Sequence, residues 1–136
     1  MVDVFTPAER SRVMSRVRDK NTKPELMVRS LLHRLGFRFR LHRADLPGKP
    51  DIVLPRHHSV VFVHGCFWHQ HRGCKAAVRP SSRREYWDAK LDGNVNRDRR
   101  DKAHLHRLGW RVLVVWECHT KSENRLRAKL LTFLKT

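Results

Sequence analysis

The sequence predicts a single α/β domain over residues 1–136, with a small mixed sheet flanked by helices. Three observations carry this prediction. Short apolar runs of strand length alternate with longer segments of helical periodicity, in the order α, α, β, β, β, loop, α, α, β, α. The 136 residues are enough for one hydrophobic core and too few for two. Neither an internal repeat nor a linker divides the chain.

Two helices are expected near the N-terminus, because residues 6–9 and 22–25 both carry an N-cap threonine, an early proline and a capping-box glutamate. The first helix has only a thin apolar stripe: Val13, Met14 and Val17. Residues 1–20 are therefore expected to form a basic arm that lies on a partner, or else an ordinary surface helix. The second helix belongs in the core, because apolar residues recur along it at helical spacing: Val28, Leu31, Leu32 and Leu35.

Three strands are expected next. Residues 37–42 alternate apolar and basic side chains, which is typical of a half-exposed strand. Residues 51–54 and 59–63 are short and apolar, and the loop between them predicts a hairpin.

The second half of the chain predicts helices around one more strand. After a basic loop at residues 75–84, helical segments are expected to open at Glu85 and to run from Asn94 to Leu108. Residues 110–116 are the most apolar strand, and a last helix is expected at about residues 122–134.

The chain is strongly basic, with 30 Lys+Arg against 13 Asp+Glu and a formal net charge of +17. Such a charge favours a polyanion as partner, most commonly the phosphate backbone of nucleic acid. A ribosomal-type RNA binder and a merely solvated basic surface are the alternatives. No membrane association is expected, because no apolar run could span a bilayer and no basic helix has a broad apolar face. Three cysteines without an export signal indicate a reducing, cytoplasmic environment.

Chemically active residues are concentrated at positions 63–74, which read Val-His-Gly-Cys-Phe-Trp-His-Gln-His-Arg-Gly-Cys. This stretch has too many groups that need polar or metal partners to be a buried core segment. It also has too much adjacent aromatic surface for a solvated loop. We therefore expect a site in which metal ligands, imidazoles and flat side chains meet one partner.

A structural zinc site is predicted within this stretch. Cys66, His71 and Cys74 place three soft ligands within nine residues, and Cys118 follows 44 residues later, at the end of a strand. Three thiolates and one imidazole in a tetrahedron form a closed set that leaves no position open for solvent. The spacing is not among the commonest for zinc fingers, so three unrelated cysteines are the alternative.

An acid–histidine site is predicted at the end of the hairpin. A turn centred on residues 57 and 58 would bring Asp51 directly across from His64, on the same face of the sheet. The carboxylate, the imidazole and the backbone carbonyls where the ladder stops would suit Mg²⁺ and general-base chemistry.

Further residues extend this site. Asn94 and Asp98 share one face of a helix, and Asp98 would fix the tautomer of His69 if the two meet. A surface ion pair of Asp98 with Lys102 is the alternative. Glu25 is already explained as a capping-box residue.

Phe67, Trp68 and Trp87 do not recur at strand or helix spacing within apolar runs. Aromatic side chains on a basic surface stack on bases or wedge between them. This interpretation is favoured over packing in the core.

Four segments are recognisable together: residues 50–51 (Pro-Asp), 63–69 (Val-His-Gly-Cys-Phe-Trp-His), 94–98 (Asn-Val-Asn-Arg-Asp) and 110–118 (Trp-Arg-Val-Leu-Val-Val-Trp-Glu-Cys). They resemble the very short patch repair (Vsr) DNA mismatch endonucleases, from about Asp3 to the last helix. The resemblance implies a restriction-endonuclease-like fold. It also implies a Mg²⁺-dependent nick in one strand of double-stranded DNA, 5′ to the thymine of a T·G mismatch. Such mismatches arise when 5-methylcytosine deaminates, so these enzymes accompany a DNA cytosine methyltransferase.

The resemblance further implies catalytic roles. Asp51 would bind Mg²⁺ through its carboxylate and Val63 through its backbone carbonyl. His69, oriented by Asp98, would activate water. Two residues would assist around the metal and the scissile phosphate: His64 and Glu25. Four residues would hold the structural zinc: Cys66, His71, Cys74 and Cys118.

DNA contacts are implied in both grooves. Three aromatic residues would wedge into the stack beside the mismatch from the major groove: Phe67, Trp68 and Trp87. Two residues of the arm would come from the minor-groove side: Met14 and Val17. Lys90 and Asn94 are further expected DNA contacts.

The chain departs from the family pattern at two points. Position 63 is often Thr in the family, and Val63 keeps only the backbone carbonyl. The spacer of Arg72 and Gly73 between two zinc ligands varies in length among members, and glycine there makes accommodation easy.

Two other functions fit parts of the pattern: a zinc-stabilised nucleic-acid-binding module without catalysis, and a nuclease of the histidine-metal HNH type that cuts matched duplex. The acid–imidazole cluster favours an enzyme, because a binding module has no need of it. As partners we expect mismatch-repair proteins and a repair polymerase. We also expect a monomer that associates with the nucleoid through DNA.

Overall fold

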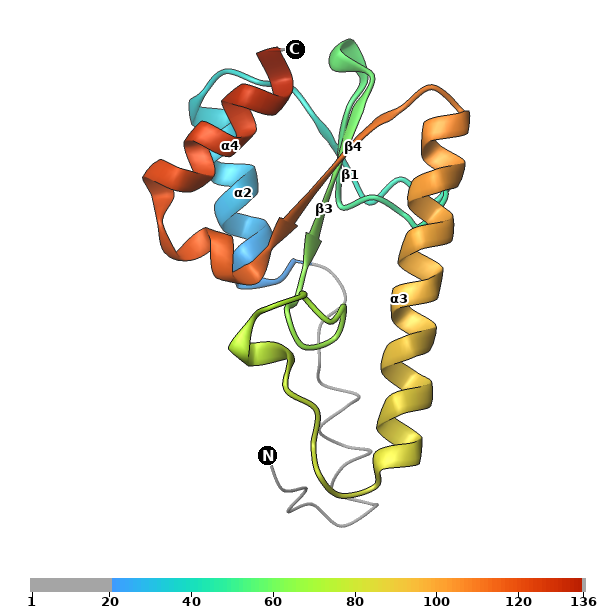
Figure 1. Cartoon of the computed structure of the whole chain (residues 1–136). Helices are drawn as coiled ribbons and strands as arrows, with labels where there is room; N and C mark the ends of the chain where they lie inside the picture. Colours follow the sequence, from blue (N-terminus) through green and yellow to red (C-terminus); the bar gives the residue numbers. More distant parts are fainter. Residues whose placement is uncertain (1–20, 136) are drawn as a thin grey trace.

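The structure, a computed structural model, describes residues 21–135 of the chain. One four-stranded sheet lies between helices α2 and α4 on one side and helix α3 on the other (Figure 1). The N-terminal arm expected at residues 1–20, with Met14 and Val17, lies outside the described residues. Within the described part, no helix is both long enough and apolar enough to cross a membrane.

The sheet has the order β1-β2-β3-β4. Its strands are β1 (Arg40–Leu41), β2 (Ile52–Leu54), β3 (Ser59–His64) and β4 (Arg111–Trp116). The first three strands pair antiparallel, whereas β3 and β4 pair parallel, so the sheet is mixed as predicted. Parallel neighbours need a crossover. The chain therefore leaves β3 at His64 and passes through residues 65–83, the central loop, into α3. It returns in β4, which ends beside β3 at Trp116.

Helices α2 (Lys23–Arg34) and α4 (Glu123–Lys135) cover one face of the sheet. They share a core with the strands, whose buried members are Val28, Leu31, Leu32, Ile52, Leu54, Val61, Val115, Leu126, Leu130 and Leu134. The predicted cap of α2 is present, because the Glu25 N–H donates to Thr22 Oγ1. The second predicted helix is therefore confirmed as a core helix.

Helix α3 (Arg84–Arg107) covers the other face through a smaller cluster of Val53, Val60, Phe62 and Leu105. Successive side chains of a strand point to opposite faces of a sheet. Along β3, Val63 thus packs toward α2 and α4, while Phe62 lies on the α3 side and contacts His64 there. This alternation places the imidazole of His64 under α3.

Two predicted elements differ from the structure. The two helical segments expected from Glu85 and from Asn94 form one 24-residue helix, α3. Gly93 does not end it, because a single glycine costs only about 1 kcal/mol in a helix and buried Trp87, Leu91 and Leu105 anchor both halves. The strand expected at residues 37–42 is reduced to β1, since Phe37 and Phe39 pack against the core instead of extending the ladder.

The predicted register of the hairpin is wrong. A 3₁₀ turn at Pro55–His57, followed by His58 in the left-handed region, links β2 to β3 and pairs Ile52 with Val61. The expected turn centre would have paired Ile52 with Val63. Continued by one residue, the observed register sets Asp51 opposite Phe62 rather than His64.

Candidate active site

A cleft of about 1330 Å³ opens where β3 and β4 end. Its lining comes from the start of α2, the turn before β2, the ends of β3 and β4, the central loop and the middle of α3. All residues predicted to take part in catalysis line it: Glu25, Asp51, Val63, His64, His69 and Asp98. Segments far apart in the sequence thus converge on one open cavity.

Basic side chains lie along the walls of the cleft: Lys49, Arg72, Arg97, Arg99 and Lys102. Five carboxylates line the same cleft: Glu25, Asp51, Asp98, Asp101 and Glu117. Cationic side chains beside carboxylates suit a phosphate backbone whose reacting group must also meet a metal or a base.

The structure brings His69 and Asp98 together, as the family resemblance implied. Asp98, in the middle of α3, places Oδ2 2.6 Å from Nδ1 of His69 on the central loop. In the neutral tautomer that suits this contact, Nδ1–H donates to the carboxylate. The lone pair of Nε2 then points away from Asp98 and is free to accept a proton.

The imidazole of His64 stacks on that of His69, with ring centroids 3.8 Å apart and planes inclined by 5°. Burial, together with a smaller contribution from the neighbouring His69, lowers the pKa of His64 to about 3. His64 is therefore uncharged at neutral pH. In this state it can exchange hydrogen bonds, and its ring packs against that of His69.

Asp51 stands immediately before β2, and its Oδ2 accepts a hydrogen bond from the Val63 N–H at 2.7 Å. The carboxylate is thus fixed beside the residue whose carbonyl is the other predicted Mg²⁺ ligand. The expected direct pair of Asp51 with His64 is not formed, because the hairpin register is different. The side-chain ligand atoms of Asp51 lie instead within 4.8 Å of those of Glu25 and His42.

Glu25 does more than cap a helix. Its side chain is almost fully buried, at 1% exposure, and its carboxylate does not close the capping box on Thr22. Oε1 accepts from the Asn21 N–H at 3.3 Å, and Oε2 faces Arg29 at 3.0 Å and His42 at 2.9 Å. Sequence reasoning missed His42, because it stands in a basic, alternating segment without a motif.

The four predicted soft ligands come together: the ligand atoms of Cys66, His71, Cys74 and Cys118 lie within 4.8 Å of one another. Nδ1 of His71 is 3.7 Å from Cys66 Sγ and 3.4 Å from Cys118 Sγ. A tetrahedral site with bonds of about 2.3 Å to sulfur and about 2.0 Å to nitrogen has ligand atoms about 3.6 Å apart. The donor set therefore fits zinc, and the four residues are brought together as the zinc prediction requires.

The surroundings shift the pKa values of these ligands in different directions. Burial lowers the pKa of His71 and so favours the neutral imidazole that binds metals. The backbone amide of Ala76 lowers the pKa of Cys74, whereas burial raises the pKa of Cys66 to about 12. A buried thiol of this kind loses its proton only when a metal replaces it.

The three predicted wedge residues form one aromatic cluster. Ring centroids lie 5.1 Å apart for Phe67 and Trp68, 5.5 Å for Phe67 and Trp87, and 6.0 Å for Trp68 and Trp87. Trp68 lines the cleft and is half-buried, but Trp87 is only 6% exposed. Within the described part of the chain, Nε1 of Trp87 has no hydrogen-bond partner. Trp87 thus forms the base of the cluster and Trp68 its face toward the cleft.

Side-chain contacts from α3 and from Arg79 hold the part of the central loop that carries Phe67 and Trp68. Asn94, expected to contact DNA, donates from Nδ2 to the Trp68 carbonyl at 2.9 Å. Arg79, which the sequence left in an unstructured loop, donates to Gln70 and also to Asp88 and Asp92 of α3 at 2.7–2.9 Å. Lys90, the other expected contact, is exposed on α3.

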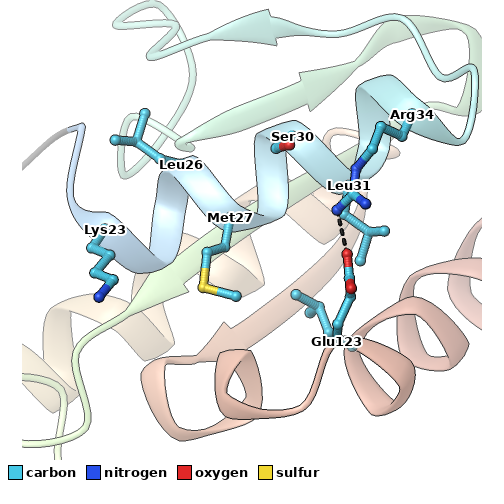
Figure 2. A pocket seen from close by; sticks show the side chains of 8 residues that line it. Lys23, Leu26, Met27, Ser30, Leu31, Arg34 and Glu123 are labelled. Atoms are coloured by element: carbon cyan, nitrogen blue, oxygen red, sulfur yellow. Dashed lines mark hydrogen bonds and ion pairs between the residues drawn. The ribbon is translucent and has the colours of Figure 1, made fainter.

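A second, smaller hollow of about 240 Å³ lies between α2 and α4 (Figure 2). Leu26 and Met27 line it, and the ion pair of Arg34 with Glu123 crosses it. None of the possible metal-binding groups found among the described residues lies in it. The large cleft is therefore the candidate active site.

A mixed sheet between helices, with carboxylates and imidazoles gathered at one end, defines the class of restriction-endonuclease-like proteins. The catalytic domain of a homing endonuclease has this fold, with a TM-score of 0.58 over 83% of this chain and 94% of that domain, at 20% identity.

Sequence comparison identifies the family. The family model of the DNA mismatch endonuclease Vsr matches residues 2–75. The chain is 52% identical to the type II nicking enzyme V.XorIIP of Xanthomonas oryzae pv. oryzae, over 98% of both chains. It is 44% identical to the DNA mismatch endonuclease Vsr of Escherichia coli K12, over 97% of this chain and 84% of that protein. The chain belongs to the Vsr family of DNA mismatch endonucleases, and it is a DNA endonuclease.

Proposed function

We propose that this endonuclease nicks one strand of double-stranded DNA, 5′ to the thymine of a T·G mismatch, in a Mg²⁺-dependent reaction that starts very short patch repair. The observation that carries the proposal is the His69–Asp98 pair, which lines the same cleft as Asp51. A base and a hard oxygen ligand around one position are what hydrolysis of a phosphodiester requires. The relatives' names, which include mismatch endonuclease and nicking enzyme, support the same reaction.

The residues present fit Mg²⁺, which prefers oxygen ligands and keeps part of its water shell. Asp51 would hold it through the carboxylate and Val63 through the carbonyl, with Glu25 nearby. The side chain of Val63 packs into the core on the α2 side, so a hydroxyl at this position is not needed as a ligand. When bound, Mg²⁺ supplies Lewis-acid stabilisation of the charge that develops on the scissile phosphate.

His69 is proposed as the general base. Its Nε2 takes the proton of the attacking water, while Nδ1–H keeps its hydrogen bond to Asp98. Asp98 fixes the tautomer and stabilises the imidazolium that forms. Neutral His64, stacked on His69, keeps the ring from turning away from the cleft.

Recognition of the mismatch is proposed to fall to the aromatic cluster. Phe67 and Trp68 would enter the base stack from the major groove, with buried Trp87 behind them as support. Asn94 would position the loop as well as meet DNA, and Lys90 would contact a phosphate. Met14 and Val17 of the arm complete the proposed contacts from the minor groove. Mismatch-repair proteins and a repair polymerase would act on the nick.

The test is nicking of end-labelled duplexes with Mg²⁺: one T·G mismatch, its matched control, and duplexes with other mismatches. We expect one nick, 5′ to the mismatched thymine. Asp51→Asn should lower the rate by about 10³-fold or more, because a bound cation stabilises the transition state by several kcal/mol. DNA binding by this variant should persist.

The other outcomes are equally clear. Tight binding of the mismatch without a cut would favour a zinc-stabilised binding module. Equal cutting of the matched duplex would leave a nuclease but overturn the proposed substrate.

A further inference from the structure

The carboxylate of Glu25 is held from two directions. A buried carboxylate needs hydrogen-bond donors, and Oε2 of Glu25 has two of them. Arg29 reaches it from the next turn of α2, at 3.0 Å, and His42 reaches it from the sheet side through Nε2, at 2.9 Å. Arg29 already supplies the opposite charge, so charge neutralisation does not explain the contact with His42.

His42 also touches the neighbouring metal-ligand candidate. Its backbone N–H donates to the carbonyl oxygen of Asp51 at 3.1 Å. One residue therefore bonds Glu25 with its side chain and Asp51 with its main chain. The side-chain ligand atoms of all three residues lie within 4.8 Å of one another.

The backbone of His42 is bent to make this arrangement. Its φ is +48°, in the left-handed region that a residue with a Cβ enters at a cost of about 1 kcal/mol or more. The bend comes directly after β1 ends at Leu41. An uncommon conformation of this kind persists only where surrounding contacts require it.

We propose that His42 is a positioning residue, which aligns the carboxylate of Glu25 with that of Asp51 so that both face one divalent cation. The proposal rests on the proposed function of the cleft as a metal site. His42 acts through Glu25 and Asp51 and is not itself a ligand, because its Nε2 is directed at Oε2 of Glu25. Without His42, Glu25 stays paired with Arg29 but loses its fixed orientation toward Asp51.

The test is cation binding by the full-length, zinc-loaded protein, measured as Mn²⁺ titration by electron paramagnetic resonance. His42→Ala and His42→Leu should raise the Mn²⁺ dissociation constant about 10-fold, the usual cost of losing an outer partner of a metal ligand. His42→Gln should restore most of the affinity, because its amide can donate to Glu25. Asp51→Asn supplies the baseline without the site. The Mg²⁺ concentration at half-maximal nicking should shift by the same factor, with DNA binding unchanged.

His58 provides the matched control. It is also a histidine in the left-handed region, at φ +49°, but it lies at the hairpin turn with its ring edge against Trp110. His58→Ala and His58→Gln should change thermal stability without changing Mn²⁺ affinity.

A merely structural role predicts another pattern. If His42→Ala lowers the melting temperature as His58→Ala does and leaves Mn²⁺ affinity unchanged, the proposal is overturned. If the alanine variant does not fold, the comparison of His42→Gln with His42→Leu, which lacks a donor, decides in the same way. Normal Mn²⁺ effects in a protein that does not nick T·G duplexes would leave His42 in place and overturn the proposed function instead.

Discussion

Two imidazole-containing clusters share Trp116 as a common wall. The ring of His71, in the Cys/His cluster, stacks on Trp116 with centroids 4.3 Å apart. The ring of His64, in the cluster with His69 and Asp98, meets the same indole edge-on at 5.4 Å. The two clusters are thus neighbours at the ends of β3 and β4, but one is a closed set of ligands and the other is open to the cleft.

The difference lies in what completes each cluster. The Cys/His cluster is a closed set of four soft ligands, and its buried Cys66 has a thiol pKa near 12 without a metal. The cluster of His64, His69 and Asp98 is open to the cleft, as is the neighbouring Asp51. The protein already supplies partners for these groups, such as Val63 N–H for Asp51 and Asp98 for His69. The first cluster should therefore depend on its metal for folding. The second should be formed before metal or DNA arrives.

Breaking the Cys/His cluster should have the largest effect. Protein purified without added zinc should carry one Zn²⁺ per chain. Structural zinc supplies on the order of 10 kcal/mol in small zinc-binding peptides, and the whole stability of a domain is about 5–15 kcal/mol. Chelation, or Cys118→Ser, should therefore unfold much of the chain. Metal analysis and urea unfolding with and without chelator measure this.

The control for this experiment is Asp51→Asn, which removes a proposed Mg²⁺ ligand from the cleft beside the other cluster. Its urea midpoint should stay close to that of the wild type. Metal-free protein with an unchanged midpoint would show that the cluster is not a structural zinc site.

Residues that are close in the sequence or share a helix face could be predicted to lie together from the sequence alone. Three of the four soft ligands lie within nine residues, so local spacing alone pointed to the Cys/His cluster. Helix periodicity placed Asp98 on one face with Asn94, and the family resemblance implied its pairing with His69. The α/β class, the core helices and the mixed sheet were predicted from the hydrophobic periodicity and the order of the elements.

Features that depend on the exact path of a turn could not be predicted. The predicted hairpin register was wrong by two residues, because Ile52 pairs with Val61 and not with Val63. A 3₁₀ turn with left-handed His58 has no clear sequence signal. The roles of His42 and Arg79 were missed for a related reason. Each acts through partners that only the folded chain brings near, Glu25 in one case and Asp92 in the other.

The second prediction is that the protein loses stability in acid because His64 is buried and uncharged. The pKa of buried His64 is about 3 in the folded protein, below the ordinary value of 6.5, so the unfolded chain takes up a proton first as pH falls. His64 therefore does not affect the pH dependence of the free energy of unfolding above pH 6.5. Between pH 6.5 and about pH 3 it lowers this free energy as the pH falls. At about 1.4 kcal/mol per pH unit, the loss between pH 6.5 and about pH 4 is on the order of 3 kcal/mol.

His64→Gln should remove this dependence. The measurement is the free energy of unfolding in urea for wild type and variant, at several pH values from about 7 to about 4. Acid also releases metal from thiolates, but that loss is common to both proteins and cancels in the difference. Parallel curves for the two proteins would contradict a buried, neutral His64.

The smallest predicted effect separates orientation from chemistry within the open cluster. Asp98→Asn should lower the single-turnover nicking rate by about 10- to 100-fold, a part of the 10²–10⁴ that a general base supplies. The amide can donate to Nδ1 of His69 and so place the proton on Nε2, where the base is needed. Zinc content, melting temperature and DNA binding should stay unchanged, unlike the result of breaking the Cys/His cluster.

Two comparisons make this prediction specific. Asp101→Asn also removes one negative charge from the same helix and cleft, and it should leave the rate nearly unchanged. In a His69→Ala background, Asp98→Asn should cause no further loss, because a residue that acts through His69 has nothing left to orient. Additive losses in the double variant would mean that Asp98 acts on the cation or the DNA directly. Asp98 would then not be a positioning residue for His69.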